Sequence, residues 1–394
     1  MIMKDSVSQE TIKTANREKI LHLLIEKREL TKQEISKKTG ISVPTVTHNI
    51  NRLLKEGILE EAGVSASTGG RRPVLLRFVP DSKYTFGIDL SPKNIRIILA
   101  NLDQNIQADI SFANRNFKTM DEIMEQIHRH LMEILSRNKI PRSKILGIGI
   151  SLYGTVNEER MILEMAPNLK IKEKNIAFQK YKSLFGFPVF IENDANLSAL
   201  AMLLQKEAKD IEDLVYVVIE TGIGCGIVIK GQLFKGENKR AGEFGHMTVA
   251  SNGRRCACGG KDCWELYASE RALIREYNHR SGQRIKDFTK VLSLVKSGDP
   301  EALDSWHQYL DYLAIGIKNI ILVHDPRCIV IGGKISCYEE LLIEPLKDRI
   351  FKENSFYDRD DVVIIASTLK ENGAIIGASL LPLQKYLFLN KKII

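Results

Sequence analysis

Two apolar runs of one design lie about 130 residues apart: Tyr84-Thr-Phe-Gly-Ile-Asp89-Leu90 and Leu214-Val-Tyr-Val-Val-Ile-Glu220-Thr-Gly222. Each run has the length and composition of a buried strand, and each leads into an acid. Further apolar runs follow at residues 95–100 and 226–229, and stretches of helical periodicity come next. This repetition predicts an α/β fold in which two similar lobes face each other across a ligand cleft.

The overall composition is that of a globular protein with a basic N-terminal end. The 394 residues are 44% hydrophobic, enough to bury a core in two or three domains. The first 80 residues hold 14 Lys and Arg against 9 Asp and Glu, which suggests a polyanionic partner. The N-terminus lacks the apolar core of a signal peptide, and charged side chains interrupt the apolar stretch at residues 315–331. We therefore expect a cytoplasmic protein without membrane segments and without disulfides.

Residues 1–80 have the helix caps, turns and strand patterns of a winged helix-turn-helix. An apolar stripe at residues 20–24 indicates a first helix, and Thr31 and Glu34 form a capping box that begins a second helix. After the turn at residues 39–41, Ser42 is expected to cap a third helix. These three helices predict a DNA-binding domain over residues 1–80.

The third helix offers one face to the core and one to a partner. Its apolar stripe consists of Val46, Ile50, Leu53 and Leu54. The opposite face carries short hydrogen-bonding groups and one cation, a surface that fits the major groove of DNA, although a plain solvated face is the alternative.

Residues 58–61 and 74–78 alternate like two strands of a hairpin, and the tip between them includes Gly69-Gly70-Arg71-Arg72-Pro73. Such a slender cationic tip can reach phosphates or a narrow minor groove, although it can also be an ordinary surface hairpin. The expected DNA contacts are Ser42, Pro44, Thr45, Thr47, His48, Asn51, Arg52, Arg71 and Arg72.

A compact set of potential zinc ligands lies between residues 243 and 265. Three thiols, Cys256, Cys258 and Cys263, follow His246, and glycines between them allow the loop to turn tightly. One imidazole and three thiolates satisfy a closed tetrahedral zinc ion, which predicts a structural rather than a catalytic metal. The alternative is a group of unrelated reduced thiols.

Several motifs together resemble the ROK family of bacterial repressors, open reading frames and sugar kinases. They are Glu192-Asn193-Asp194-Ala-Asn196, Thr221-Gly-Ile-Gly-Cys-Gly226, Ala241-Gly-Glu243-Phe-Gly-His246, the cysteine cluster, and Val330-Ile-Gly332-Gly333. With the winged helix in front, the chain is most similar to the xylose-repressor branch. The resemblance implies an actin-like, hexokinase-like domain over residues 81–394, with lobe 1 at about 81–195 plus a C-terminal helix from about 372, and lobe 2 at about 196–371. It also implies a homodimer or a dimer of dimers.

The resemblance further implies a sugar in the cleft. The family's contacts fall on Asn168, Asn193, Asp194, Glu243, His246 and Glu265. Carboxylates and amides suit a ring of hydroxyls that each donate and accept, and His246 would bind zinc through one nitrogen and face the sugar with its other edge. A simpler role for Asn193 and Asp194 is to cap the helix that follows them.

In kinases of this family, the acid at the position of Asp194 is the catalytic base, and a loop reading Asp-x-Gly-Gly-Thr wraps the phosphates of ATP. Here the loop reads Asp89-Leu-Ser91-Pro92-Lys93-Asn94, without either glycine. Proline has no N–H to donate, and side chains hinder the close approach of a phosphate. We therefore expect no bound ATP and no catalytic residue, and we interpret the glycine turn at 222–226 as a strand connection.

These expectations combine into one function. The chain is expected to be a transcriptional repressor of a carbohydrate operon that binds a palindromic operator and leaves it when xylose or a related sugar enters the cleft. The alternative is an ATP-dependent sugar kinase with an appended winged-helix domain.

Overall fold

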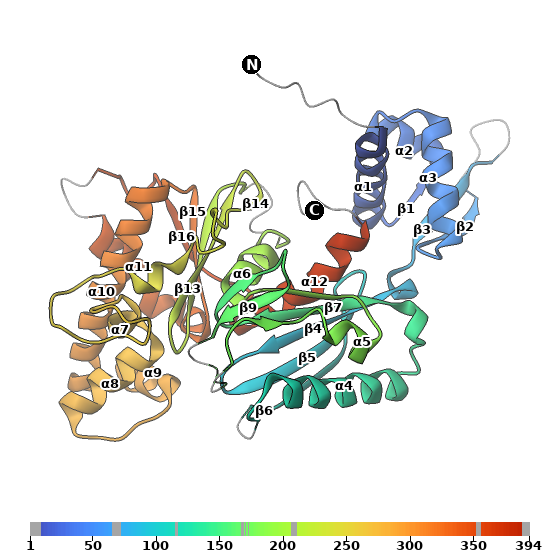
Figure 1. Ribbon diagram of the computed structural model, residues 1–394. Helices are drawn as coiled ribbons and strands as arrows, with labels where there is room; N and C mark the ends of the chain where they lie inside the picture. Colours follow the sequence, from blue (N-terminus) through green and yellow to red (C-terminus); the bar gives the residue numbers. More distant parts are fainter. Residues whose placement is uncertain are drawn as a thin grey trace, which may run out of the picture.

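The computed structural model describes residues 9–64, 72–114, 117–166, 169, 171, 173–205, 211–351 and 356–387. A winged N-terminal part sits on a body of two lobes, with the C-terminal helix α12 (Gly373–Leu387) beneath it (Figure 1). The body has the two α/β sheets that the repeated apolar runs predict. No helix of the described residues has the length and apolarity to cross a bilayer.

The winged part folds as its helix caps and turns predict. Its elements are α1 (Gln9–Lys27), β1 (Glu29–Thr31), α2 (Lys32–Thr39), α3 (Val43–Lys55), β2 (Leu59–Val64) and β3 (Val74–Phe78). Thr31 accepts from the Glu34 amide while the Glu34 carboxylate accepts from the Thr31 amide, which confirms the capping box. Val46, Ile50 and Leu53 are fully buried on the inner face of α3.

Two details of the winged part differ from expectation. Strand β1 was not predicted, because three residues are too few to show an alternating pattern; it completes a sheet in the order β1-β3-β2. Ser42 stands at the N-cap of α3, but its hydroxyl makes no cap hydrogen bond and instead lies 3.0 Å from the Thr45 hydroxyl. Pro44 in the first helical turn has no N–H that would need a cap.

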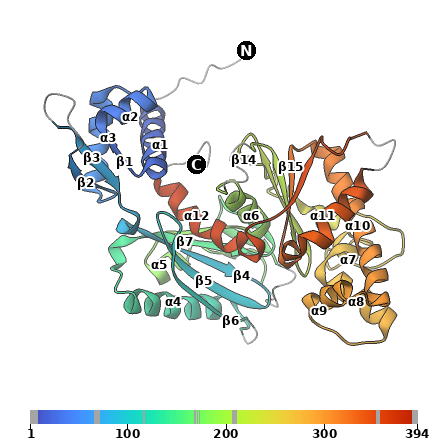
Figure 2. The same cartoon turned by 180° about the vertical axis from the view of Figure 1, so that it is seen from behind.

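Lobe 1 is built on a five-stranded sheet in the order β11-β7-β4-β5-β6. Its elements are β4 (Tyr84–Leu90), β5 (Asn94–Asn101), β6 (Ile106–Ala113), α4 (Met120–Arg137), β7 (Ile145–Leu152), β8 (Thr155–Asn157), β9 (Ile162–Met165), β10 (Ile176–Ala177), α5 (Tyr181–Phe185) and β11 (Val189–Asn193). Helix α4 packs on one face of the sheet, and α12 packs on the other (Figure 2). Strands β8, β9 and β10 form a separate small sheet at the side facing lobe 2.

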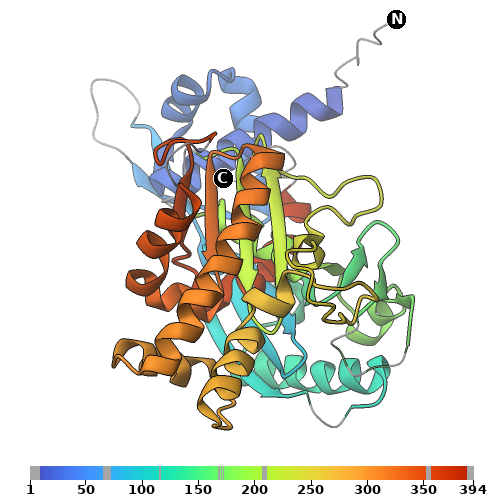
Figure 3. The ribbon, with the colours of Figure 1, turned by 90° about the vertical axis from the view of Figure 1, so that its left-hand side faces the viewer.

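Lobe 2 repeats this plan. Its elements are β12 (Leu214–Ile219), β13 (Ile223–Ile229), β14 (Gln232–Leu233), α7 (Glu265–Ala268), α8 (Glu270–Ser281), α9 (Phe288–Lys296), α10 (Pro300–His324), β15 (Cys328–Gly332), α11 (Glu339–Ile350) and β16 (Val363–Ala366). The sheet order is β14-β13-β12-β15-β16, so in both lobes an antiparallel meander continues into two parallel strands. The long helix α10 runs along the lobe and buries its apolar face in the core (Figure 3).

Helices α6 (Asp194–Met202) and α12 connect the two lobes at very short range. They lie against glycines: a Cβ atom at Gly149 of β7 would overlap the Ala378 carbonyl of α12, and one at Gly226 of β13 would overlap the Ala195 carbonyl of α6. Gly377 brings the two helices together in the same way, against the Leu197 carbonyl. These contacts fix the lobes relative to one another without intervening side chains.

The winged part contacts α12 through a shared carboxylate and through apolar side chains. Glu56, at the end of α3, accepts from Arg17 at 2.7 Å, from Arg52 at 3.0 Å and from the Tyr386 hydroxyl at 3.1 Å. Leu383 of α12 belongs to the same apolar core as the winged helices. One continuous core therefore joins the winged part to the helix that also connects the lobes.

The glycine contacts predict a large and specific loss of stability. Gly149→Ala forces β7 and α12 apart and is expected to destabilise the protein by about 3 kcal/mol or more, as overpacking of a tight core does. Gly298→Ala is the matched control, because Gly298 has a φ of +80° but open space around it, so only backbone strain of about 1 kcal/mol is expected. Urea unfolding of both variants measures the difference, and equal losses would contradict the packing argument.

Candidate functional site

A cavity of 630 Å³ lies between the lobes. Its wall brings together residues that are far apart in sequence: Tyr153, Gly154, Thr155, Glu164, Met165, Asn175, Asn193, Asp194, Val218, Glu220, Thr221, Gly222, Ile223, Gly224, Arg240, Glu243, His246, Ala257, Cys258 and Glu265. Five of the six expected sugar-binding residues are among them, while Asn168 lies outside the described residues. The volume exceeds that of one sugar ring and is within the usual range of small-molecule pockets.

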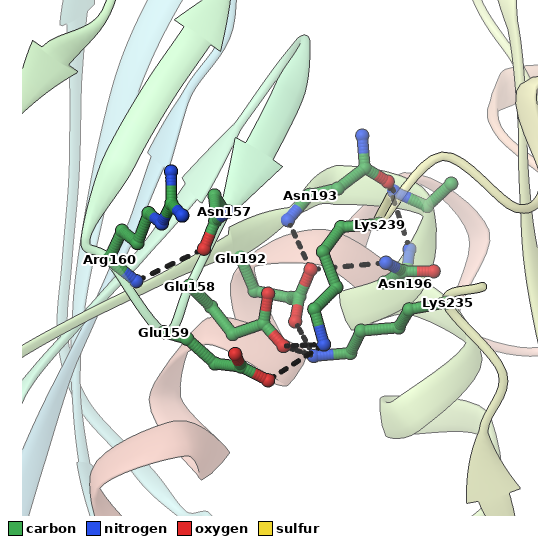
Figure 4. Close-up of polar contacts among 10 residues, drawn as sticks. Asn157, Glu158, Glu159, Arg160, Glu192, Asn193, Asn196, Lys235 and Lys239 are labelled. Atoms are coloured by element: carbon green, nitrogen blue, oxygen red, sulfur yellow. Dashed lines mark hydrogen bonds and ion pairs between the residues drawn. The ribbon is translucent and has the colours of Figure 1, made fainter. Parts of the chain in front are cut away.

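Asn193 is held in the cavity wall by hydrogen bonds of its own side chain. At the junction of β11 and α6, its Oδ1 accepts from the amides of Ala195 at 2.9 Å and Asn196 at 3.2 Å, so the helix-capping role is observed (Figure 4). Its Nδ2 donates to the Gly154 carbonyl and to Asp194 Oδ1, each at 3.1 Å. Asn193 therefore orients the Asp194 carboxylate at the cavity.

Carboxyl groups crowd the inner end of the cavity: Asp194 and Glu220 line it, and Asp89 lies behind them in the wall of a neighbouring cavity. The Tyr153 hydroxyl lies 3.5 Å from Asp89 and 3.4 Å from Glu220. Burial raises the pKa of Asp89 to about 7, and the Glu220 carboxylate adds to the rise, while a hydrogen bond from Ser151 opposes it. Burial, together with Glu220 and Asp89, also raises the pKa of Asp194 well above its usual range. These carboxyl groups therefore keep their protons at pH values at which they would lose them in water.

The cysteine loop forms the outer wall. The ligand atoms of His246, Cys256, Cys258 and Cys263 all lie within 4.8 Å of one another. His246 Nδ1 is 3.7 Å from the Cys256 sulfur, and the sulfurs of Cys258 and Cys263 are 3.6 Å apart. A tetrahedral zinc with bonds of about 2.0–2.3 Å separates its ligands by about 3.5–3.8 Å, so this set fits zinc.

The same loop supplies polar groups to the cavity. With Nδ1 turned to the thiols, His246 presents Nε2 on the side of Glu243, whose carboxylate is 3.8 Å away. Glu265 is buried and accepts from the Cys256 thiol at 3.1 Å. A metal bound here would therefore hold the His246 ring at the cavity wall, whereas a metal-bound Cys256 thiolate would no longer donate to Glu265.

A second cavity of 420 Å³ shares Tyr153, Glu220 and Thr221 with the first and is also lined by the turn at residues 91–94. The amide of Ser91 donates to the Asn94 carbonyl at 3.1 Å, and the amide of Asn94 donates to the Ser91 hydroxyl at 3.1 Å. Pro92 has no N–H. The turn thus uses its own donors internally and leaves few for a phosphate.

Most of the expected DNA contacts belong to α3, and Ser42 is its N-cap residue. Ser42, Pro44, His48, Asn51 and Arg52 are exposed or partly exposed. Thr45 and Thr47 are half-buried, Arg72 is exposed ahead of β3, and Arg71 lies outside the described residues.

Several cavity residues were not anticipated from the sequence. Tyr153 follows the end of β7, a position where ligand residues gather in parallel sheets, so this signal was available. Glu164, Met165 and Arg240 come from the β8–β9 hairpin and from a loop of lobe 2, and no local pattern marks them. Only the arrangement of the lobes brings them to the cavity.

Comparison with known proteins gives a consistent result. Residues 85–385 match the ROK family, and residues 13–60 match a winged helix-turn-helix DNA-binding family. The chain is 28% identical to the xylose repressor of Bacillus subtilis over 388 residues, which cover 97% of this chain and 98% of that protein.

The solved structures that are similar to the chain include a regulator and a kinase. The crystal structure of a ROK family transcriptional regulator, a homolog of the E. coli MLC protein, superposes with a TM-score of 0.82 at 25% identity and covers 96% of this chain and 98% of the other. A ROK family glucokinase from Streptomyces griseus in complex with glucose and AMPPNP superposes with a TM-score of 0.66 at 25% identity and covers 76% and 99%.

The raised pKa of Asp89 predicts a pH-dependent stability. The unfolded carboxyl loses its proton near pH 4, whereas the folded one keeps it up to about pH 7, so its contribution to stability falls as pH rises from 4 to 7. Asp89→Asn is therefore expected to gain stability over the wild type with rising pH, by up to about 4 kcal/mol at pH 8. Thermal unfolding at pH 5 and pH 8 measures this. Glu61→Gln, at an exposed site, controls for loss of charge, and parallel pH profiles of wild type and Asp89→Asn would refute the assignment.

Proposed function

The chain belongs to the ROK family, and from this membership we propose that it is a sugar-responsive transcriptional repressor. The observation that carries the proposal is the presence of a winged DNA-binding part and a polar inter-lobe cavity in one chain that is similar to a xylose repressor over nearly its full length. We place the boundary between the two functions near residue 80, where β3 has ended and β4 has not begun.

The effector is a pyranose such as xylose or glucose, bound in the cavity. Asp194, Glu243, His246 and Glu265 face it from separate segments, and Asn168 adds a further contact. A site that pairs each hydroxyl discriminates strongly against sugars that lack one. Asn193 contributes mainly by aiming Asp194, since its own amide is already bonded.

Zinc bound by His246, Cys256, Cys258 and Cys263 supplies structural order. The donor set and its spacing support this ion over a hard cation, which prefers oxygen ligands. The ion then holds the His246 ring against the sugar, and Glu265 faces the same cavity from α7.

The winged part binds operator DNA. The exposed face of α3 enters the major groove with Thr45, Thr47, His48 and Asn51, while Ser42, Pro44 and Arg52 lie at its margins. Arg71 and Arg72 of the wing reach phosphates or the minor groove. A homodimer would place two such helices on a palindromic site.

A sugar kinase with an appended winged helix is the alternative, favoured by Asp194 at the position of the base and by the similarity to the glucokinase. The turn at residues 91–94 argues against it, because the amides of Ser91 and Asn94 are bonded within the turn and Pro92 has no N–H. A coupled ATP-consumption assay with pentoses and hexoses distinguishes the two, and we expect no turnover.

Sugar and operator are expected to weaken each other's binding. On an operator fragment selected from random DNA, a sugar found by thermal-shift screening should reduce affinity by about 5–150-fold, the usual range of allosteric coupling. Asp194→Ala should keep operator affinity in the absence of sugar but lose most of the response, because both carboxyl oxygens that would pair a sugar hydroxyl are gone. Fluorescence anisotropy measures both. Unchanged operator affinity across a broad sugar panel would disprove the proposal.

Removal of zinc is expected to weaken sugar binding before it affects DNA binding. A chelator should release one equivalent of zinc per chain and lower sugar affinity by about 10–100-fold, as loss of ligand orientation does. Cys258→Ser should reproduce the effect, whereas Cys337→Ser, at an exposed cysteine remote in sequence from the loop, should not. Metal analysis and calorimetry provide the readouts, and a metal-free protein with full sugar affinity would exclude this role.

A further inference from the structure

A row of ion pairs joins the lobes beside the cavity. Lys235, Lys239 and Arg240 follow β14 in lobe 2, and each pairs with an acid of the β8–β9 hairpin in lobe 1. Lys235 lies 2.7 Å from Glu158, Lys239 lies 2.7 Å from Glu159, and Arg240 lies 3.0 Å from Glu164. Figure 4 shows the first two pairs side by side. Glu164 and Arg240 line the cavity itself, so this row borders it.

Lys235 differs from the other two cations because one of its acidic partners is buried; Lys239 also lies 3.9 Å from Glu158, but neither of its partners is buried. The Lys235 ammonium pairs with Glu192, whose side chain is only 3% exposed, and Lys235 itself is 20% exposed. The nearer partner of Lys239, Glu159, is 71% exposed. An exposed pair contributes little, whereas a buried carboxylate without a cation is strongly unfavourable. Lys235 is thus the member of the row on which the local structure depends.

Glu192 connects Lys235 to residues of the cavity wall. Its Oε2 faces Lys235, while its Oε1 accepts from the backbone amide of Asn193 at 2.9 Å and from the side-chain amide of Asn196 at 3.0 Å (Figure 4). Asn193 in turn caps α6 and donates to Asp194. A chain of direct contacts therefore runs from the Lys235 ammonium to the Asp194 carboxylate.

We propose that Lys235 is a positioning residue for the effector sugar: by neutralising Glu192 it fixes the junction of β11 and α6, and by binding Glu158 it holds the β8–β9 hairpin against lobe 2. The proposal rests on the proposed function, since it takes the cavity as the sugar site. Lys235 itself does not line the cavity, so its effect on the sugar passes through Glu192 and Asn193.

The arrangement has a consequence for lobe closure. Lys235 bonds two acids of lobe 1 from a loop of lobe 2, so any opening of the cavity at this edge separates a buried charge from its partners. Such a separation is costly in a poorly hydrated environment. The pairing thus favours the closed arrangement, in which the residues around the sugar converge.

The test compares Lys235→Met with Lys239→Met in the full-length protein. Hydrogen exchange at residues 192–200 without sugar, and calorimetric affinity for D-xylose and D-glucose, are measured for both variants. We expect Lys235→Met to speed exchange at the start of α6 by about tenfold or more and to weaken sugar binding at least about tenfold. Lys239→Met should stay within about twofold of wild type in both measurements, and Lys235→Arg should restore most of the affinity.

A double variant separates positioning from general stability. Glu192→Gln with Lys235→Met removes both charges, so its melting temperature should return toward that of the wild type. Its sugar affinity should stay weak, because no cation of lobe 2 then holds residue 192 and Glu158 has lost its nearest partner. Wild-type exchange or wild-type sugar affinity in Lys235→Met, or full affinity in the double variant, would overturn the proposal. If wild-type protein binds neither sugar, the proposed effector fails, and exchange at α6 still decides whether Lys235 holds Asn193.

Discussion

The architecture depends on contact between backbones where α6 and α12 cross the two sheets. Gly149, Gly226 and Gly377 have no side chain to place at these crossings, so backbone carbonyls of the helices approach them where a Cβ atom would stand. Close packing of this kind has few alternative arrangements. The packing of α6 and α12 on the sheets therefore sets the distance between the ends of β11 and β12. This distance, more than the side chains that line the cavity, determines the cavity's shape.

The chemistry of the cavity follows from that geometry. Two sheets of the same topology each direct an acid, Asp89 from β4 and Glu220 after β12, toward the same place, and Asp194 begins α6 nearby. Carboxyls gathered in this way retain protons, so some of them donate while others accept. Such a mixture suits a sugar, whose hydroxyls also do both. It suits a polyphosphate poorly, and the self-bonded turn at residues 91–94 agrees with this difference.

Local signals predicted much of the fold. The capping box at Thr31, the apolar stripe of α3 and the strands at residues 84–90 and 214–219 are each determined by residues close together in the sequence. The structure contains all of these predicted features. The cysteine spacing likewise anticipated a cluster that the structure brings together. The dual hydrogen bonding of Asn193 and the pairing of Lys235 with Glu192 join segments 39 and 43 residues apart, and no local pattern encodes such contacts.

Glu56 receives hydrogen bonds from α1, α3 and α12 at once, and one of its partners, Arg52, lies on the α3 face proposed for DNA. A guanidinium that is bonded to Glu56 is less available to a phosphate of the duplex. The C-terminal helix, through Tyr386, therefore helps to hold an acid that competes with the operator for the same positive charge. If that helix moved, Glu56 would lose the Tyr386 hydrogen bond, and the availability of the Arg52 guanidinium to a phosphate of the duplex would change with it.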